Sequence, residues 1–337
     1  MFRVFIIILV TTTFIPCGYS QVESNKVIDE IIKKGVEQIL LQNYSNADSI
    51  FSGIEHVDPK NPMMELMKAS VMISMATDYE EPFNENKFEE LLKNAENKIK
   101  LYFSSKLKKD YYFGLLNGFH SYADWYRGKW FGAFANGLRA LNYFEELLEH
   151  SRNAYDAKIA IGIYKYWRSR KSEVLSWLPF LNDEKSYGIS LIEEDIKGET
   201  YFLHLALHSL AWVYIDYKNP LKAIKLCEDI LAQYPQNRFF LWALARAYED
   251  VDLTKSIIHY KKLLASIQNS KMNGYNEIVV LHILAQKEFL LKNNQNALSY
   301  IQELYSVRYE SSIKEKLADR FSDIRNLRGE ILAKLHD

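Results

Sequence analysis

Two stretches far apart in the chain repeat the same spacing of small and bulky residues. Residues 35–62 read GVEQILLQNYSNADSIFSGIEHVDPKNP, and residues 211–237 read AWVYIDYKNPLKAIKLCEDILAQYPQN. The matching residues are Gly35, Ala47, Phe51 and Pro59 in the first stretch and Ala211, Ala223, Cys227 and Pro235 in the second. In both stretches the successive steps are 12, 4 and 8 residues. The match predicts that one structural unit occurs at both places.

The spacing has a simple physical reason. Two antiparallel helices that cross closely need a small residue at the contact, and bulky residues beside it fill the space to the next pair. Proline then ends the second helix because it has no N–H to donate to the preceding turn. A single pair buries too little apolar surface to be stable, so neighbouring pairs must stack. The pattern therefore predicts an all-α array of antiparallel helix pairs.

The same period continues beyond both stretches. A step of 34 residues leads from Gly35 to Ala69 and from Ala211 to Ala245. In the unit of Ala245 the second helix begins one residue early. The small and bulky positions of the two later units are Ser256 and Tyr260, and then Ala285, Ala297 and Ile301. The last units of the chain are therefore predicted to be regular.

These residues resemble the repeat of the tetratricopeptide-repeat family. The unit of that family has a small residue early in its first helix and a Tyr three residues later. An Ala follows at the start of the second helix, then a bulky residue four positions on, and a Pro at the end. The resemblance covers most of the chain after residue 20. It implies an α-solenoid, a right-handed superhelix of helix pairs that binds a protein or peptide partner.

The middle of the chain departs from this period. Residues 109–148 are typical of a helix pair, in which we expect Gly118 to occupy the small position of the first helix. Ala133 and Gly137 are expected to make the close contact in the second helix. The pair is therefore predicted to belong to the array although its spacing differs.

The sequence that follows contains an interruption. A helix with Gly162 at a predicted contact precedes a Leu-Pro-Phe stretch at 178–180, which cannot continue a helix smoothly. This order of elements resembles the Iml2-like branch of tetratricopeptide proteins over residues 154–238.

The chain is therefore predicted to have five parts. They are a signal peptide (1–20), N-terminal helices (21–106), a divergent helical region (107–200), clear repeats (201–308) and a capping helix (309–337). Apolar residues in the last part recur every three or four positions, at Leu317, Phe321, Ile324, Leu327 and Ile331. That spacing is typical of a helix that covers the open face of the last repeat.

The N-terminus has the layout of a signal peptide. Arg3 precedes an apolar run at 4–10, and Pro16 is followed by small residues before a predicted cut at Gln21. The chain is therefore expected to be exported to the periplasm, to the outer envelope or out of the cell. The alternative is a lipoprotein signal in which Cys17 is lipidated, and we expect membrane attachment only in that case. No later stretch is apolar enough to cross a bilayer.

Composition narrows the class of protein. The 337 residues are 48% hydrophobic and 25% charged, which is ordinary for a globular protein. The formal net charge is −1, so there is no basic excess to neutralise phosphates, and nucleic-acid binding is disfavoured. Cys17 and Cys227 are the two cysteines, so loss of the signal peptide would leave no disulfide partner for Cys227. Cys227 lies on an apolar helical face and is predicted to be a small buried residue.

Local signatures of catalysis are absent from the sequence. It has no GxGxxG, Walker A, GxSxG, HExxH or CxxC motif. His204 and His208 share a helix face, but no third metal ligand follows at a diagnostic spacing. The acidic clusters at 80–81 and 193–195 are typical of solvated faces. We therefore predict no catalytic residue, metal or cofactor. An enzyme with a dispersed site, using the two histidines or the insertion at 178–188, is the less favoured alternative.

The predicted partner-binding surface is the concave groove of the later repeats. The first helix of each pair lines this groove, at positions 5, 9 and 12 of the unit. The polar and aromatic residues at these positions are His208, Trp212, Trp242, Arg246, Glu249, His282, Gln286 and Phe289. Trp and Arg are enriched at interface hot spots because both bury a large area and carry a polar group. The alternative for the two tryptophans is packing between neighbouring pairs.

The function expected from these features is partner binding. An export signal, a solenoid and a mixed aromatic and polar groove together indicate a scaffold that binds a protein or peptide in the cell envelope. A lipid-anchored accessory of envelope assembly or transport is the alternative.

Overall fold

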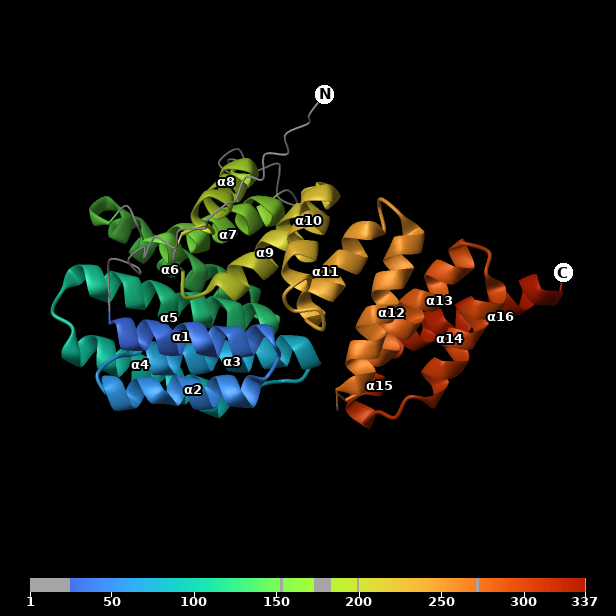
Figure 1. Ribbon diagram of the computed structural model, residues 1–337, viewed down its shortest axis with the longest axis horizontal. Helices are drawn as coiled ribbons and strands as arrows, with labels where there is room; N and C mark the ends of the chain where they lie inside the picture. Colours follow the sequence, from blue (N-terminus) through green and yellow to red (C-terminus); the bar gives the residue numbers. More distant parts are fainter. Residues whose placement is uncertain (1–24, 152–153, 173–182, 199, 271–272, 337) are drawn as a thin grey trace, which may run out of the picture.

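The computed structural model describes residues 25–151, 154–172, 183–198, 200–270 and 273–336, which contain sixteen α-helices and no β-strand (Figure 1). In chain order the helices are α1 (Lys26–Leu40), α2 (Tyr44–Val57), α3 (Met63–Tyr79), α4 (Glu85–Tyr102), α5 (Lys106–Tyr126), α6 (Trp130–His150), α7 (Tyr155–Ser172), α8 (Lys185–Asp195), α9 (Leu203–Asp216), α10 (Pro220–Leu231), α11 (Arg238–Tyr248), α12 (Leu253–Asn269), α13 (Tyr275–Leu290), α14 (Asn294–Ser306), α15 (Ser311–Lys316) and α16 (Ala318–His336). The predicted all-α class is confirmed. None of these helices is both long and apolar enough to cross a bilayer. The predicted signal peptide, Cys17 and the stretch at 178–180 lie outside the described residues.

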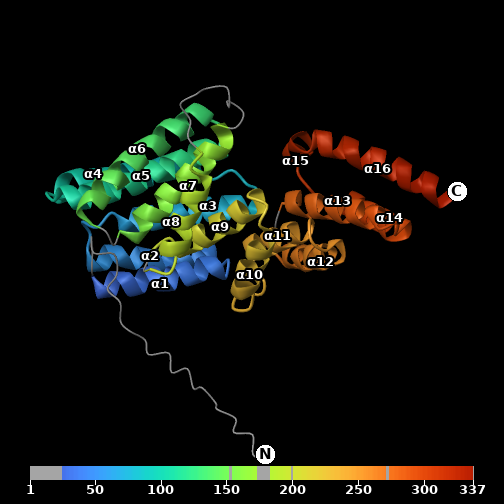
Figure 2. The same ribbon diagram turned by 90° about the horizontal axis from the view of Figure 1, so that it is seen from above.

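The helices form a curved array of pairs. From α1/α2 to α13/α14, each odd-numbered helix packs on the next helix, and each even-numbered helix packs on the first helix of the following pair. Figures 1 and 2 show α1–α6 at one end of the long axis, α12–α16 at the other and α9–α11 between them. The stacking is that of the predicted α-solenoid.

Three first helices end in the same turn. The residues that close it are Gln42, Lys218 and Lys292, after α1, α9 and α13, with φ of 60°, 58° and 62°. In each turn the next residue is an Asn whose N–H donates to the carbonyl five residues earlier, at 2.8–2.9 Å. Gly128, with φ of 72°, and Lys129 make the same turn after α5. α3 ends in the same way at Glu80, with φ of 54°, where the Glu81 N–H donates to the Ala76 carbonyl oxygen at 3.3 Å. This is the Schellman C-cap, and five pairs share it.

The shared turn corrects one prediction about the third pair. Counting back seven residues from the left-handed residue gives Ser121 in α5, as it gives Gly35, Ala211 and Ala285 in the regular pairs. Ser121 Oγ donates to the Ala133 carbonyl oxygen at 2.7 Å. Gly118 was the wrong residue for the small position, because a Cβ built on it would meet nothing within 4 Å. The turn at Gly128 sets the register, and Gly118 lies one helical turn before the contact.

Other predicted small contacts are confirmed. A Cβ on Gly35 would lie 2.2 Å from the Phe51 ring, so no larger residue fits there without a shift. Gly162 of α7 faces Gly188 of α8, and a Cβ on either would meet the other's carbonyl oxygen at 2.7 or 2.6 Å. Cys227 is buried as predicted, and burial raises the pKa of its thiol to about 12. The small residues thus mark the helix crossings.

The C-terminal segment forms two helices rather than the single helix predicted. α15 ends at Lys316, and Leu317 leaves helical geometry with φ of −104° and ψ of 17°. Leu317, Ile324 and Ile331 are all buried, and α16 packs on α14 and α13. The break occurs where Ile313 of α15 and Leu317 both turn towards the core.

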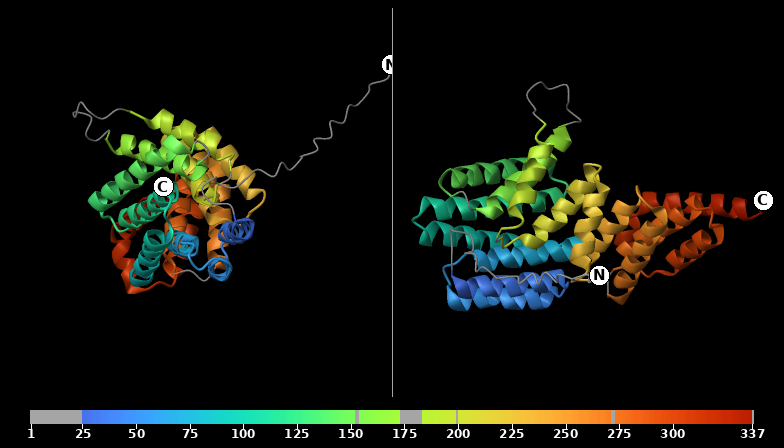
Figure 3. Two further views of the ribbon diagram at one scale, coloured as in Figure 1. Left: turned by 90° about the vertical axis from the view of Figure 1, so that its left-hand side faces the viewer. Right: turned by 45° about the horizontal axis from the view of Figure 1, so that its top comes forward.

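The array curves so strongly that its later helices contact its first helices. The end-on view of Figure 3 shows α1 to α10 arranged round a ring, and α9 contacts α1. Asn237, just before α11, donates its amide N–H to the Leu40 carbonyl oxygen at 2.7 Å, and Asn276 of α13 donates to the Asp78 carbonyl oxygen at 2.7 Å. One hydrophobic core joins α1 through α11, and a second joins α11 through α16. We call the first part the closed body and the second part the arm.

Candidate functional site

A buried ion pair holds the closed body together. The Arg238 Nε donates to Asp78 Oδ1 at 2.7 Å, and its Nη2 pairs with Oδ2. The Tyr44 hydroxyl and the Gln42 side-chain amide also donate to Asp78 Oδ2, at 2.8 and 3.0 Å. Asp78 is 4% exposed and Arg238 is 6% exposed. Side chains from the α1–α2 turn, α2, α3 and α11 therefore converge on one carboxylate, which leaves neither charge unpaired.

The closure covers part of the inner face of the first repeats. His204, in the first turn of α9, has its Nε2 3.1 Å from Ser70 Oγ of α3. The Tyr201 hydroxyl donates to Asp29 Oδ1 of α1 at 2.7 Å. All four side chains are buried. The groove expected along the first helices is therefore filled by the chain itself at these positions.

His204 and His208 are packing groups in this closure. The Trp212 Nε1 donates to His208 Nε2 at 2.9 Å, and the His208 ring packs on Phe239 with centroids 4.9 Å apart. Burial, helped by the neighbouring His208, lowers the pKa of His204 to about 3, and burial lowers that of His208 to about 4. Both rings are therefore neutral near pH 7. Trp212 and His208 are half-buried and form one unit with the start of α11.

The positions of these side chains do not favour the alternative of an enzyme or metal site that uses the two histidines. Ser70 and His204 are within hydrogen-bond distance, but Ser70 is 0% exposed and no substrate reaches its hydroxyl. In the ranges that the structure describes, no three His, Cys, Asp or Glu side chains are grouped so as to hold a metal ion. The cluster at 193–195 was predicted to be solvated, but Asp195 is 4% exposed and pairs with Lys158 at 3.0 Å. Glu193 pairs with Lys222 at 2.6 Å.

The predicted residues of α11 lie on the surface of the arm. Trp242 is half-buried, with its ring packed edge-on against Tyr260 at 5.9 Å, and the Arg246 side chain is 37% exposed. Glu249 accepts from Arg246 at 3.0 Å, from Lys287 of α13 at 2.7 Å and from the Tyr260 hydroxyl at 2.6 Å. The structure thus brings Trp242, Arg246 and Glu249 together and ties them to α12 and α13. We call this set, with Lys287, the arm surface.

The three predicted groove residues of α13 differ in their exposure to solvent. Gln286 is exposed and Phe289 is half-buried, on either side of Lys287. His282 is 1% exposed, and its Nδ1 lies 3.1 Å from Arg320 Nη1 of α16. His282 therefore offers no surface to a partner, because α16 covers it. The repeat period contained no signal for where the last helix would pack.

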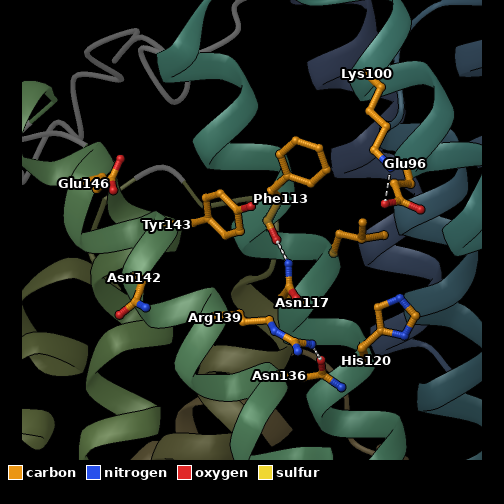
Figure 4. A pocket seen from close by; sticks show the side chains of 11 residues that line it. Glu96, Lys100, Phe113, Asn117, His120, Asn136, Arg139, Asn142, Tyr143 and Glu146 are labelled. Carbon is orange, nitrogen blue, oxygen red and sulfur yellow. Dashed lines mark hydrogen bonds and ion pairs between the residues drawn. The ribbon is translucent and has the colours of Figure 1, made fainter.

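An open groove of about 810 Å³ lies elsewhere, between α4, α5 and α6 (Figure 4). Its polar lining includes Asn117, His120, Asn136, Arg139, Asn142 and Glu146. Phe113 and Tyr143 stack in it with ring centroids 5.5 Å apart. We call it the outer groove, because α4 and α6 are second helices of their pairs. Nothing in the repeat pattern pointed to it, since most of its residues lie on α5 and α6 in the divergent middle.

Large apolar side chains are also exposed on α5 and α6, two of the helices that line the outer groove. Phe131 in the first turn of α6 is 94% exposed, and Phe134 and Leu138 on the same helix are also exposed. Trp125 near the end of α5 is exposed as well. Exposed apolar patches of this kind mark contact surfaces or aggregation hazards.

The comparisons with known proteins concern the fold. No family model and no curated protein matches the sequence. A tetratricopeptide-repeat chain of the APC/C hetero-tetramer Cut9–Hcn1 superposes with a TM-score of 0.53 at 14% identity, over 92% of this chain and 53% of that one. The chain has the tetratricopeptide-repeat fold. It spans about half the length of that Cut9–Hcn1 chain.

Two other solved structures are more distant. One is the C-terminal part of a TPR repeat-containing protein from Cytophaga hutchinsonii, with a TM-score of 0.43 and 15% identity over 85% of this chain and 99% of that one. The other is a tetratricopeptide repeat protein from Parabacteroides merdae, with a TM-score of 0.37 and 11% identity over 91% and 100%. The Iml2-like resemblance of the middle stays a prediction, as do the boundaries of the five parts.

Proposed function

We propose that this tetratricopeptide-repeat protein is a protein-binding scaffold of the cell envelope, and that it holds a segment of its partner on the arm surface. The observation that carries the proposal is the position of Trp242 and Arg246. They lie one helical turn apart, both partly exposed, on a helix that the Glu249 network fixes. A preorganised aromatic ring beside a cation loses little side-chain entropy on binding.

The closed body supports the same assignment indirectly. His204 and His208, which occupy the groove in its middle, are engaged by Ser70 and Trp212. Of the predicted groove, the residues left with exposed area for a partner lie mainly on α11 and α13: Trp242, Arg246, Glu249, Gln286 and Phe289. Export rests on the signal layout of residues 1–20 and on nothing else.

A photo-cross-linking experiment tests the binding site. A photoreactive amino acid at Gln286 is expected to capture a discrete partner from envelope extract, and the same amino acid at Leu221, an exposed position on α10, is the matched control. Trp242→Ala with Arg246→Ala is expected to abolish capture at Gln286 while the melting temperature stays within a few degrees. Equal capture at both positions, or capture that survives the double substitution, rules the arm surface out.

The lipid-anchored alternative differs in the mature N-terminus. Intact-protein mass spectrometry of material from the native membrane distinguishes the two. A chain that begins at Gln21 supports a freely exported scaffold, whereas a diacylated Cys17 supports an envelope assembly or transport accessory anchored by lipid.

A further inference from the structure

Helix α6 carries large apolar side chains on its outer face, and Figure 2 shows this helix along the edge of the closed body. Phe131 is 94% exposed. Trp130, Phe134 and Leu138 on the same helix are 55%, 54% and 40% exposed. From residue 130 to residue 144 the only charged residue is Arg139. A helix at a protein surface normally turns charged and polar side chains to the water, so the outer face of α6 has the composition of a contact surface.

The exposed apolar area of this face can be compared with what a stable dimer needs. One fully exposed large side chain offers about 200 Å², so these four side chains together offer roughly 500 Å². A stable interface buries about 800 Å² on each partner, and homodimer interfaces are about 65% apolar. The requirement is then about 520 Å² of apolar surface on each partner. The outer face of α6 supplies nearly all of that area.

The exposed residues lie in two rows along the helix, each with a spacing of four residues. We call these rows the α6 stripe: Trp130, Phe134 and Leu138 in one, and Phe131, Ala135 and Arg139 in the other. Rows with this spacing are the ridges that interdigitate when two helices pack. The first row is bulky throughout, whereas the second is small at its centre, where Ala135 leaves room for a ring.

A two-fold axis beside Phe134 and Ala135 would fit the two rows to each other. With the helices antiparallel, Phe134 of each copy lies opposite Ala135 of the other copy. Phe131 of each copy then lies opposite Leu138 of the other. The α6 stripe is therefore complementary to itself in shape, as the interface of a two-fold symmetric dimer has to be.

The single charge of the stripe is compatible with this arrangement. Arg139 of one copy lies opposite Trp130 of the other, and a guanidinium is attracted to the face of an indole ring. Each Arg139 is four or five residues from the axis. At a rise of about 1.5 Å per residue, the two guanidinium-bearing residues are separated by roughly 13 Å along the helices. Repulsion between them is then largely screened at physiological salt, where the Debye length is about 8 Å.

We propose that the α6 stripe is the interface of a homodimer, in which the α6 helices of two copies cross about a two-fold axis beside Ala135. A bilayer surface matches the stripe less well, because Arg139 is its only cation and attraction to anionic lipid relies on clusters of about four to eight Lys or Arg. The α6 stripe and the arm surface lie on different helices, so the dimer carries two arm surfaces. Two linked sites bind a partner that repeats its segment more tightly than one site does.

Sedimentation equilibrium of the full chain tests this interface. An interface of this size gives a Kd on the order of 1–10 µM, so the wild-type chain is expected to be dimeric at about 100 µM. Ala135→Glu and Ala135→Lys each place two like charges beside the axis, and each is expected to weaken the dimer about a hundredfold. Ala135 is exposed, and Glu and Lys are both good helix formers, so the fold is expected to be retained. The matched control is Leu221→Glu, which puts a carboxylate at an exposed position of α10 and is expected to leave the dimer intact.

A mixture of Ala135→Glu with Ala135→Lys separates this interface from other routes to a dimer. The two variants are expected to dimerise with each other, because the axis places the carboxylate of one copy beside the ammonium of the other. That result, with monomeric single variants and a dimeric Leu221→Glu, supports the proposal. A wild-type chain that is monomeric at the same concentration overturns it, as does a dimer that survives both Ala135 substitutions or a mixture that stays monomeric.

Two further measurements separate the dimer from other accounts. Binding of the wild-type chain to phosphatidylglycerol vesicles without dimerisation would identify a lipid surface as the occupant of the stripe and would overturn the proposal too. Capture of a partner at Gln286 is expected to persist in the monomeric variants, so that failure of the dimer and failure of the arm surface are distinguishable.

Discussion

The closed body and the arm are built from the same kind of helix pair, but they differ in their inner faces. In the closed body, later helices cover part of the inner face of the first repeats. In the closed body, α1 and α3 meet α9 and the start of α11 through contacts between residues far apart in the sequence, such as Asn237 and Leu40, which are 197 positions apart. In the arm, neighbouring pairs pack on one another and α16 packs on α13 and α14, while Asn276 of α13 also donates to the Asp78 carbonyl oxygen. A repeat therefore specifies how adjacent pairs stack, and a few residues outside the repeat pattern decide whether the array closes.

The largest effect is expected from breaking the closure. Arg238→Leu leaves the Asp78 carboxylate buried without its cation, and loss of one partner of a buried pair costs about 3–5 kcal/mol. Urea denaturation measures the change in the free energy of unfolding. The control is Lys222→Leu, which removes the exposed partner of Glu193 and is expected to change stability by less than about 1 kcal/mol. Similar losses in both variants would show that Arg238 does not hold the two ends together.

Two glycines of the closed body test its packing. Gly162→Ala places a Cβ 2.7 Å from the Gly188 carbonyl oxygen and is expected to destabilise the chain by about 1–3 kcal/mol. Gly118→Ala is the matched control, since its Cβ meets nothing within 4 Å, and it is expected to stabilise helix α5 by roughly 0.5–1 kcal/mol. Thermal melting shows whether each substitution raises or lowers the stability of the chain. A stabilising Gly162→Ala would contradict the close crossing of α7 and α8.

Histidine titration compares the closed body with the arm. The pKa of buried His204 falls to about 3, and that of His282 falls to about 4 through burial and the Arg320 charge. Below pH 6.5 the unfolded chain binds a proton at each histidine and the folded chain does not, so stability decreases as the pH falls. The loss is at most about 2 kcal/mol per residue at pH 5. His204→Gln is expected to flatten the pH dependence of the closed body, and His282→Gln that of the arm, in urea titrations from pH 7 to 5.

The smallest effect is expected at the shared turns. Lys218 closes a turn in the closed body and Lys292 closes one in the arm, both with φ near 60°. Glycine adopts that conformation without the steric penalty of a Cβ, so Lys218→Gly and Lys292→Gly are each expected to stabilise by up to about 1 kcal/mol. Differential scanning calorimetry detects the shift. Destabilisation by both substitutions would argue against the Schellman geometry.

Most of the features that were predicted correctly from the sequence are those that the repeat period determines. The all-α fold, the small contact at Gly35 and the burial of Cys227 all follow from spacing, because adjacent helices impose it on each other. The contact at Gly162 was predicted outside the period, from a glycine within a helix. Gly118 was misplaced because the register of α5 depends on a turn conformation that spacing does not reveal.

Neither the closure through Asp78 and Arg238 nor the outer groove could be predicted from the sequence. Asp78 and Arg238 lie far apart in the chain, and each alone is typical of a solvated helix end. The covering of His282 by α16 likewise depends on long-range packing. The lining of the outer groove comes from three helices, so no single stretch of sequence carries it.

A double-mutant cycle on Asp78 and Arg238 tests the closure most directly. We expect Asp78→Ala and Arg238→Ala each to destabilise the chain strongly, and the double variant to lose much less stability than the sum of the two losses. The coupling free energy from urea denaturation is then about 2–3 kcal/mol, at the upper end for residues in one buried network. A coupling near zero would contradict the closed body and would leave the first repeats open to a partner.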